Sequence, residues 1–208
     1  MPLASLLDAV ATAGQFPLLT GVTATFESGQ VYVITGPNGA GKTSLLRVLA
    51  GLEPLVRGEG HVLGYDLTSP QRRLVRRHVG WLGHEGSFYD ELTVTENLEF
   101  AVRATNGELS RLPGALEVVG LDSRRDVRAK NLSAGQRRRM GLAWLLVRRA
   151  ELWLLDEPYA SLDDDGRATF DDVLSAATSA GSCVVLTSHD PITASVPLSF
   201  LSLRGGAT

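Results

Sequence analysis

The sequence lacks the features that mark disulfide-bonded, secreted or membrane-spanning chains. Its 208 residues include one cysteine, which excludes an intramolecular disulfide. Cys183 lies in the apolar stretch SCVVLT, so we expect a buried structural thiol. The N-terminal stretch has no basic region and carries Asp8 among its apolar residues, which argues against a secretory signal. Because no uninterrupted apolar run approaches the about 20 residues of a membrane-spanning helix, we expect a cytoplasmic chain, and any membrane role would require a partner.

An excess of charge of one sign is also missing. The formal net charge is −3, which gives no whole-protein argument for binding nucleic acid. Basic residues cluster locally at 72–77, 124–128 and 137–149, and a solvated helix face is the favoured interpretation of each cluster. The histidines show no metal-ligand spacing, so no zinc site is expected. They are His61, His78, His84 and His189.

Short apolar runs alternate with helical patterns along most of the chain. This alternation predicts an α/β fold built on a mostly parallel sheet. We expect buried strands at Val31–Thr35, 152–157 and 183–189, with helices at 44–50 and 170–180. The middle of the chain differs, because it has helical stretches, Gly and Pro breaks and little that resembles a buried strand.

We therefore expect a single domain over 1–208 with an inserted helical lobe. The lobe is predicted at about 85–131, and the core at 1–84 and 132–208.

The stretch GPNGAGKT at 36–43 fits the pattern G-x-x-x-x-G-K-[ST] between an expected strand and an expected helix. Glycines let the backbone turn its N–H groups toward phosphates, and the start of a helix adds a positive end. Lys42 places a charge against the β- and γ-phosphates, and Thr43 offers a hydroxyl to Mg²⁺. The predicted phosphate site comprises Gly36, Pro37, Asn38, Gly39, Ala40, Gly41, Lys42, Thr43 and Ser44.

Two carboxylates follow the apolar run LWLL. Asp156 is predicted to hold Mg²⁺, and Glu157 to orient or deprotonate an attacking water. Solvated acids are common at strand ends, so this assignment depends on the phosphate loop upstream. His189 follows a third apolar run at the same edge of the expected sheet, where it is predicted to contact the γ-phosphate.

The stretch NLSAGQRRRMGLAWLLVRR predicts a helix with a second anion site at its start. Ser133 and Gln136 have the spacing of a capping box. Ser133 and the N–H groups of Ala134 and Gly135 would face an anion. In isolation this pattern favours a well-capped helix without a ligand. Its apolar face is predicted to contain Met140, Ala143, Trp144 and Val147.

In this order, the motifs resemble the ATPase subunit of ABC transporters. LSAGQ at 132–136 is similar to the family's signature, SLD at 161–163 to its D-loop and His189 to its switch histidine. The resemblance implies a P-loop NTPase with a small N-terminal antiparallel β part and an inserted helical lobe. It also implies ATP and Mg²⁺ as cofactors, and a head-to-tail dimer that sandwiches ATP between one subunit's phosphate loop and the partner's signature, with Asp163 in the nucleotide site.

Two positions depart from the family's pattern. Ala134 replaces the commoner glycine of the signature, a change small enough to spare the backbone contacts. The aromatic residue that usually stacks on adenine falls at or near Ala13, and Phe16 is a nearby substitute.

The stretch WLGHEGSFYDELTVTENL, together with LSAGQ, resembles the CcmA family, the ATP-binding subunits of the haem exporter of bacterial cytochrome c maturation. His84 stands where most ABC relatives have a glutamine that reaches Mg²⁺. The resemblance implies integral membrane subunits as partners and a peripheral place on the cytoplasmic face of the cell membrane. The coupling helices of those subunits would contact exposed apolar residues of the lobe, or the same residues fill its core. The candidates are Phe88, Tyr89, Leu92 and Leu98.

Three alternatives stay open. One is the ATPase of an exporter for another substrate. The second is an ABC ATPase that acts on DNA or ribosomes without a membrane partner, although the coiled-coil or zinc insertions and tandem domains of such proteins are missing. The third is a P-loop kinase or GTPase, which leaves the LSAGQ helix unexplained. We expect no nucleic-acid partner.

Overall fold

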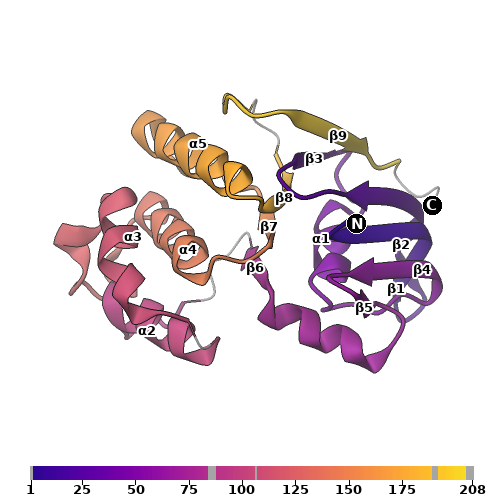
Figure 1. Cartoon of the computed structure of the whole chain (residues 1–208), viewed down its shortest axis with the longest axis horizontal. Coiled ribbons are helices and arrows are strands. Elements are labelled where there is room, and N and C mark those ends of the chain that lie inside the picture. The colour runs from indigo at the N-terminus through magenta and orange to yellow at the C-terminus, as the bar shows by residue number, and fades with distance from the viewer. Residues whose placement is uncertain (1, 84–87, 106, 189–191, 205–208) are drawn as a thin grey trace.

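The computed structural model describes residues 2–83, 88–105, 107–188 and 192–204. Two β-sheets and a group of helices make up the molecule (Figure 1). Over these residues, no helix combines the length and apolar character needed to cross a membrane.

A five-stranded parallel sheet forms the centre, with strand order β6-β7-β8-β3-β9. Its strands are β3 (Val31–Thr35), β6 (Val79–Leu82), β7 (Leu152–Asp156), β8 (Cys183–Thr187) and β9 (Leu198–Ser202). Every residue of β7 and β8 is buried. The strands predicted at 31–35, 152–157 and 183–189 correspond to β3, β7 and β8. The last two end at polar residues on the carboxyl edge, Asp156 and Thr187. Burial also raises the pKa of the Cys183 thiol to about 12, which confirms a structural cysteine.

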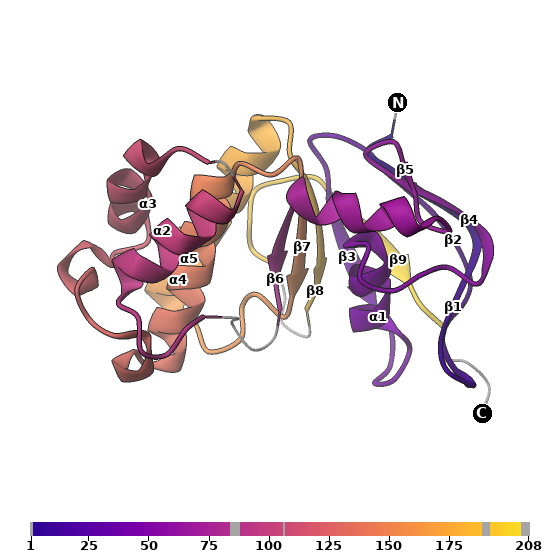
Figure 2. The same cartoon turned by 90° about the horizontal axis from the view of Figure 1, so that it is seen from below.

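A four-stranded antiparallel sheet packs against one side of this core. Its order is β2-β1-β4-β5. The strands are β1 (Ala4–Ala13), β2 (Phe16–Phe26), β4 (Arg57–Val62) and β5 (Tyr65–Asp66). Helix α1 (Lys42–Leu49) lies between the two sheets (Figure 2), and its buried leucines share one apolar cluster with both. The expected α/β fold with a small antiparallel β part is confirmed.

Helices cover the other face of the parallel sheet. The helices α4 (Ala134–Arg148) and α5 (Asp164–Ser179) contact this face, while α2 (Val94–Ala104) and α3 (Leu112–Val118) pack against α4. Short 3-10 helices connect elements: η1 (Pro70–Arg77), η2 (Leu109–Arg111), η3 (Asp122–Arg124) and η4 (Ala129–Asn131). The helices α2 and α3 lie within the predicted lobe at 85–131, whereas α4 lies in the predicted core. All three contribute to one apolar cluster. The division into core and lobe therefore stays a prediction.

Helix α4 departs from expectation at two side chains. The interpretation of 137–149 as a solvated face is wrong for Arg138, which is 9% exposed. It is buried because α4 lies directly on β6: a Cβ added at Gly141 would meet Leu82 Cδ1 at 2.4 Å. Trp144, predicted on the buried face, is only partly buried and borders a cavity.

Candidate functional site

The phosphate loop connects β3 to α1, as predicted. Gly36 (φ 142°) and Gly41 (φ 92°) adopt backbone conformations that a side chain disfavours. Neither position has room for a side chain, because an added Cβ would lie 2.5 Å from Leu203 O at Gly36 and 2.4 Å from Leu18 O at Gly41. The glycines therefore let the loop fit between β2 and the C-terminal segment.

Lys42 folds back over the loop. Its Nζ donates hydrogen bonds to Gly36 O at 2.8 Å and Pro37 O at 3.2 Å. These carbonyls hold the ammonium group at the mouth of the loop, where a phosphate oxygen could exchange with them as a partner.

Asp156 is the centre of the polar contacts at the carboxyl edge of the sheet. Its Oδ2 accepts a hydrogen bond from Thr43 Oγ1 at 2.9 Å, and its Oδ1 accepts one from Thr187 Oγ1 at 2.7 Å. A carboxylate that is 7% exposed needs such partners, since burying an unpaired charge is costly. Three elements, α1, β7 and β8, are joined through this one side chain.

Glu157 follows directly and has an unusual backbone. Its φ of 49° lies in the left-handed region, which costs a residue with a side chain of order 1–3 kcal/mol. The conformation is held by a hydrogen bond from Glu157 N to Thr187 Oγ1 at 2.9 Å. Strain of this kind is common where a structure aims a functional side chain.

These residues border one cavity of about 580 Å³. Its lining residues are Pro17, Leu18, Asn38, Gly39, Gly41, Lys42, Thr43, Ser44, Asp156 and Glu157. The structure therefore brings together most of the predicted phosphate residues and both carboxylates. The predictions missed Thr187, which is fully buried; its only signal is a hydroxyl at the end of an apolar run.

The second predicted anion site lies at the start of α4. Ser133 caps the helix: its Oγ accepts from Gln136 N at 3.2 Å, while Gln136 Oε1 accepts from Ser133 N at 3.0 Å. The predicted capping box is confirmed. Ser133 and Ala134 are exposed, and an added Cβ at Gly135 would lie 2.8 Å from Ser161 O. Among the described residues, none of 133–136 lines the cavity beside the phosphate loop.

Asp163 joins α5 to the same helix. Its Oδ1 accepts hydrogen bonds from Arg139 Nη2 at 2.6 Å and from Gly166 N at 2.9 Å. The hydrogen bond from Arg139 is the main reason that the pKa of Asp163 is lowered. The predicted nucleotide residue thus also fixes the D-loop to the helix that carries the LSAGQ motif.

The predicted metal residue His84 and the predicted γ-phosphate residue His189 lie outside the described residues.

A second cavity, of about 370 Å³, opens between η1, β6, α2 and α4. Its walls are mostly apolar and aromatic. They include Trp81, Phe88, Tyr89, Phe100 and Trp144, with Arg76 and Arg148 as the charged residues. Of the four predicted contact residues of the lobe, Tyr89 is 56% exposed and Leu98 is fully buried. Phe88 and Leu92 are partly buried.

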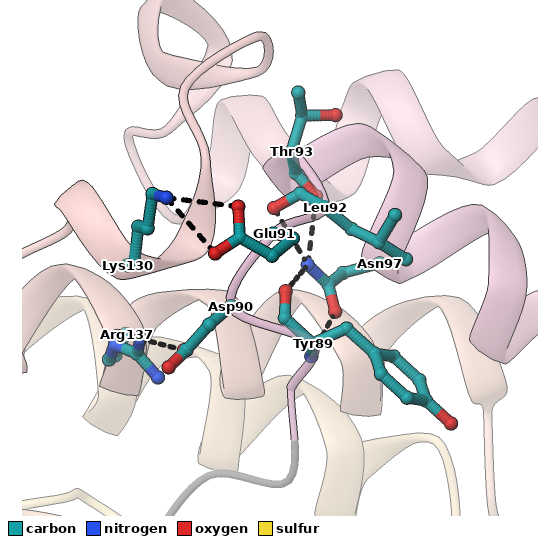
Figure 3. A network of polar contacts seen from close by, with 8 residues as sticks. All are labelled: Tyr89, Asp90, Glu91, Leu92, Thr93, Asn97, Lys130 and Arg137. Carbon is teal, nitrogen blue, oxygen red and sulfur yellow. Dashed lines mark hydrogen bonds and ion pairs between the residues drawn. The ribbon is translucent and has the colours of Figure 1, made fainter.

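The turn at 89–93 that borders this cavity is rigidly held (Figure 3). Asn97, 3% exposed, donates through Nδ2 to the carbonyls of Tyr89 (3.0 Å), Leu92 (3.2 Å) and Thr93 (2.9 Å). Its Oδ1 accepts from Tyr89 N at 2.8 Å. These buried hydrogen bonds contribute more to holding the turn than its exposed ion pairs do, because an exposed ion pair contributes about 0–1 kcal/mol.

Two such ion pairs tie the turn to the residues that flank Ser133–Gln136. Glu91 pairs with Lys130 at 2.9 Å, and Asp90 pairs with Arg137 (Figure 3). The cavity and the start of α4 are therefore connected through one short turn.

Comparison with known proteins identifies the class. The family model described as "ABC transporter" matches residues 19–160. That match covers the phosphate loop, the LSAGQ helix and the two carboxylates. The chain therefore belongs to the ABC transporter family, and it is an ATP-binding and ATP-hydrolysing subunit.

Individual relatives narrow the comparison. The chain is 41% identical over 193 residues to the "Cytochrome c biogenesis ATP-binding export protein CcmA" of Salmonella typhi, covering 91% of each chain. The protein of the same name from Nitrobacter winogradskyi is 41% identical over 177 residues, covering 84% of this chain and 86% of the relative. The resemblance to the CcmA family is confirmed.

Solved structures agree on the fold. The "ATP binding subunit of ABC transporter" superimposes with a TM-score of 0.90 at 25% identity, covering 98% of this chain and 87% of that one. A dimeric ATP-binding cassette in a post-hydrolysis state, bound to ADP and Pi, gives a TM-score of 0.87 at 22% identity, covering 98% and 95%.

Thr187→Val should disturb the carboxyl edge of the sheet. The substitution keeps the shape of the side chain but leaves Asp156 Oδ1 and Glu157 N without their shared partner, which should cost about 1–3 kcal/mol of unfolding free energy. Urea denaturation measures this loss, and ATP hydrolysis should fall with it.

The matched control is Thr187→Ser, which retains the hydroxyl and should keep ATP turnover close to that of the wild type. Equal stability and equal turnover in the Val and Ser variants would show that the hydroxyl does not organise this edge.

Proposed function

We propose that the chain is the ATPase subunit of an exporter complex that serves cytochrome c biogenesis. The observation that carries this proposal is the 41% identity to proteins named for cytochrome c biogenesis and export, over 91% of the chain. The alternative of an exporter for another substrate shares the same catalytic site and differs only in its membrane partners.

Residues at the carboxyl edge have distinct roles in this proposal. Lys42 and the loop N–H groups bind the β- and γ-phosphates. Glu157, aimed by its left-handed backbone, orients and deprotonates the attacking water. His189 is the proposed contact for the γ-phosphate.

The donor set beside the loop fits Mg²⁺. Thr43 Oγ1 and Asp156 Oδ2 lie 2.9 Å apart and border the cavity, and hydroxyl and carboxylate oxygens are ligands that this ion prefers. The ion would neutralise charge that develops on the phosphates. His84 is proposed as a third contact to it.

The separation of the two anion sites supports a head-to-tail homodimer. Ser133 and Ala134 are exposed at the start of α4, yet residues 133–136 do not line the described cavity of their own subunit. In the dimer, Ser133, Ala134, Gly135 and Gln136 of one subunit would complete the phosphate pocket of the other, with Asp163 at the interface.

Phe16 is the proposed contact for adenine. It is 78% exposed and opens β2, next to Pro17 and Leu18, which line the cavity. Ala13 ends β1 at the same hairpin and offers no ring. An exposed aromatic face at this position can stack on a base.

The second cavity is the proposed contact for the membrane subunits. Arg148 Nη2 donates to Arg76 O, its guanidinium lies 5.1 Å from the Trp144 ring, and Arg76 Nη2 donates to Gly51 O at 3.3 Å. Among the described lining residues there is no aspartate or glutamate. An apolar helix that presents a carboxylate therefore fits the second cavity.

The turn at 89–93 would carry the effect of such docking toward the start of α4, through its ion pairs to Lys130 and Arg137. We propose that the subunit lies peripherally on the cytoplasmic face of the cell membrane, where these partners would hold it.

Glu157→Gln should abolish ATP turnover and keep ATP-dependent dimerisation. The amide preserves size but cannot accept a proton, and loss of a general base typically costs about 10²- to 10⁴-fold in rate. Phosphate release measures turnover, and size-exclusion chromatography with and without ATP measures the dimer. Full activity of the variant would remove Glu157 from its role.

The same variant tests the physiological assignment. In cells whose only copy is Glu157→Gln, c-type cytochromes should lack covalently bound haem, as detected by haem staining. Normal cytochromes in cells that contain the inactive variant would refute the role in cytochrome c biogenesis and leave the ATPase function intact.

Arg76→Glu should prevent binding to the membrane subunits, because it reverses a charge at the proposed contact for a carboxylate. Co-purification from detergent extracts measures binding. Arg73→Glu is the control, since Arg73 is exposed on the same helix η1 and is not among the residues that line the second cavity. Equal retention of the membrane subunits by both variants would place the contact elsewhere.

A further inference from the structure

Helix α4 lies closely against the central sheet at its second turn. Gly141 leaves no room for a side chain against Leu82 of β6, where an added Cβ would lie 2.4 Å from Cδ1. Arg138 lies three residues earlier and thus on the same face of the helix. Its guanidinium is carried to the end of β6, and its Nη1 donates a hydrogen bond to Gly83 O at 3.0 Å.

The end of β6 lies beside the catalytic edge. Leu82 pairs with Leu155 in the parallel register of β6 and β7, so Gly83 leaves the sheet next to Asp156. Gly83 also directly precedes His84. Arg138 therefore contacts the point where the chain turns from the sheet into the segment that follows it.

Arg138 is also a buried cation that two acids influence electrostatically. Burial lowers the pKa of its guanidinium, and the negative charges of Asp156 and Glu157 oppose that lowering. With 9% of its surface exposed, the side chain is largely shielded from the screening that weakens surface charges. A buried charge of this kind is retained at a cost, which a solvated helix face would not incur.

We propose that Arg138 is a positioning residue for ATP hydrolysis. By its bond to Gly83 O, at the end of β6 next to Asp156, it fixes the direction of Glu157 relative to α4, whose first residues form the LSAGQ site. The helix that would contact the partner's ATP is thereby linked to the catalytic edge of its own subunit. This inference rests on the proposed role of Glu157.

Arg138→Met tests the proposal in the purified subunit. The variant keeps much of the apolar length of the side chain and removes the charge and the donors. We expect kcat to fall about 10- to 100-fold, as for a misplaced catalytic group, while the Kd for ATP stays within about twofold of the wild type. Arg138→Lys, which restores the charge, should recover part of the lost turnover.

Arg149→Met is the matched control. Arg149 is exposed at the C-terminal end of the same helix, so its substitution removes one positive charge from α4 without touching the catalytic edge. Its kcat should equal that of the wild type. If Arg138→Met does not fold, Arg138→Gln, which retains an amide donor but no charge, takes its place in the same comparison.

Dimerisation distinguishes positioning from simple support of the fold. In a Glu157→Gln background, Arg138→Met should still form the ATP-dependent dimer, because the proposal assigns Arg138 to the direction of residue 157 and not to nucleotide binding. Loss of that dimer, a kcat within about twofold of the wild type, or an equal loss in the Arg149 control would overturn the proposal. Absence of turnover in the wild-type subunit would instead count against the proposed function.

Discussion

The carboxylate of Asp156 is the constraint on which the active edge depends. It is nearly buried, and it accepts hydroxyl hydrogen bonds from Thr43 at 2.9 Å and Thr187 at 2.7 Å. The same Thr187 hydroxyl accepts from the backbone of Glu157 at 2.9 Å, which supports the left-handed conformation of that residue. Because a buried carboxylate is costly without partners, these hydrogen bonds fix the phosphate loop, β7 and β8 relative to one another.

The second organising feature is the separation of this edge from the start of α4. The N-terminal N–H groups of a helix lack partners within the helix and attract anions, yet Ser133 lies outside the described cavity beside the phosphate loop. The proposed composite site between two subunits would explain this separation. Arg138 and Arg139 extend from the same region of α4 to Gly83 at the end of β6 and to Asp163 at the start of α5, so that movement of α4 would reach both.

Local rules in the sequence predicted the parts of the site that depend on neighbouring residues. The loop at 36–43 and the capping box of Ser133 follow from backbone conformations and spacings that are visible along the chain. Thr187 and Arg138 could not be predicted in this way, because their roles arise from strand register and from the close approach of α4 to β6. An arginine in a basic stretch resembles a solvated residue until the packing of Gly141 is known. The lining of the second cavity could not be predicted for the same reason, since its walls come from four separate elements.

Inter-subunit cross-linking tests the composite site most directly. Asn38 and Ser133 are exposed, and the native Cys183 is buried, so cysteines introduced at the two exposed positions would be the reactive thiols. In a Glu157→Gln background that carries Asn38→Cys and Ser133→Cys, a short bifunctional thiol reagent should give a covalent dimer that depends on ATP. A cross-link within one chain, or no covalent dimer with ATP present, would contradict the head-to-tail arrangement.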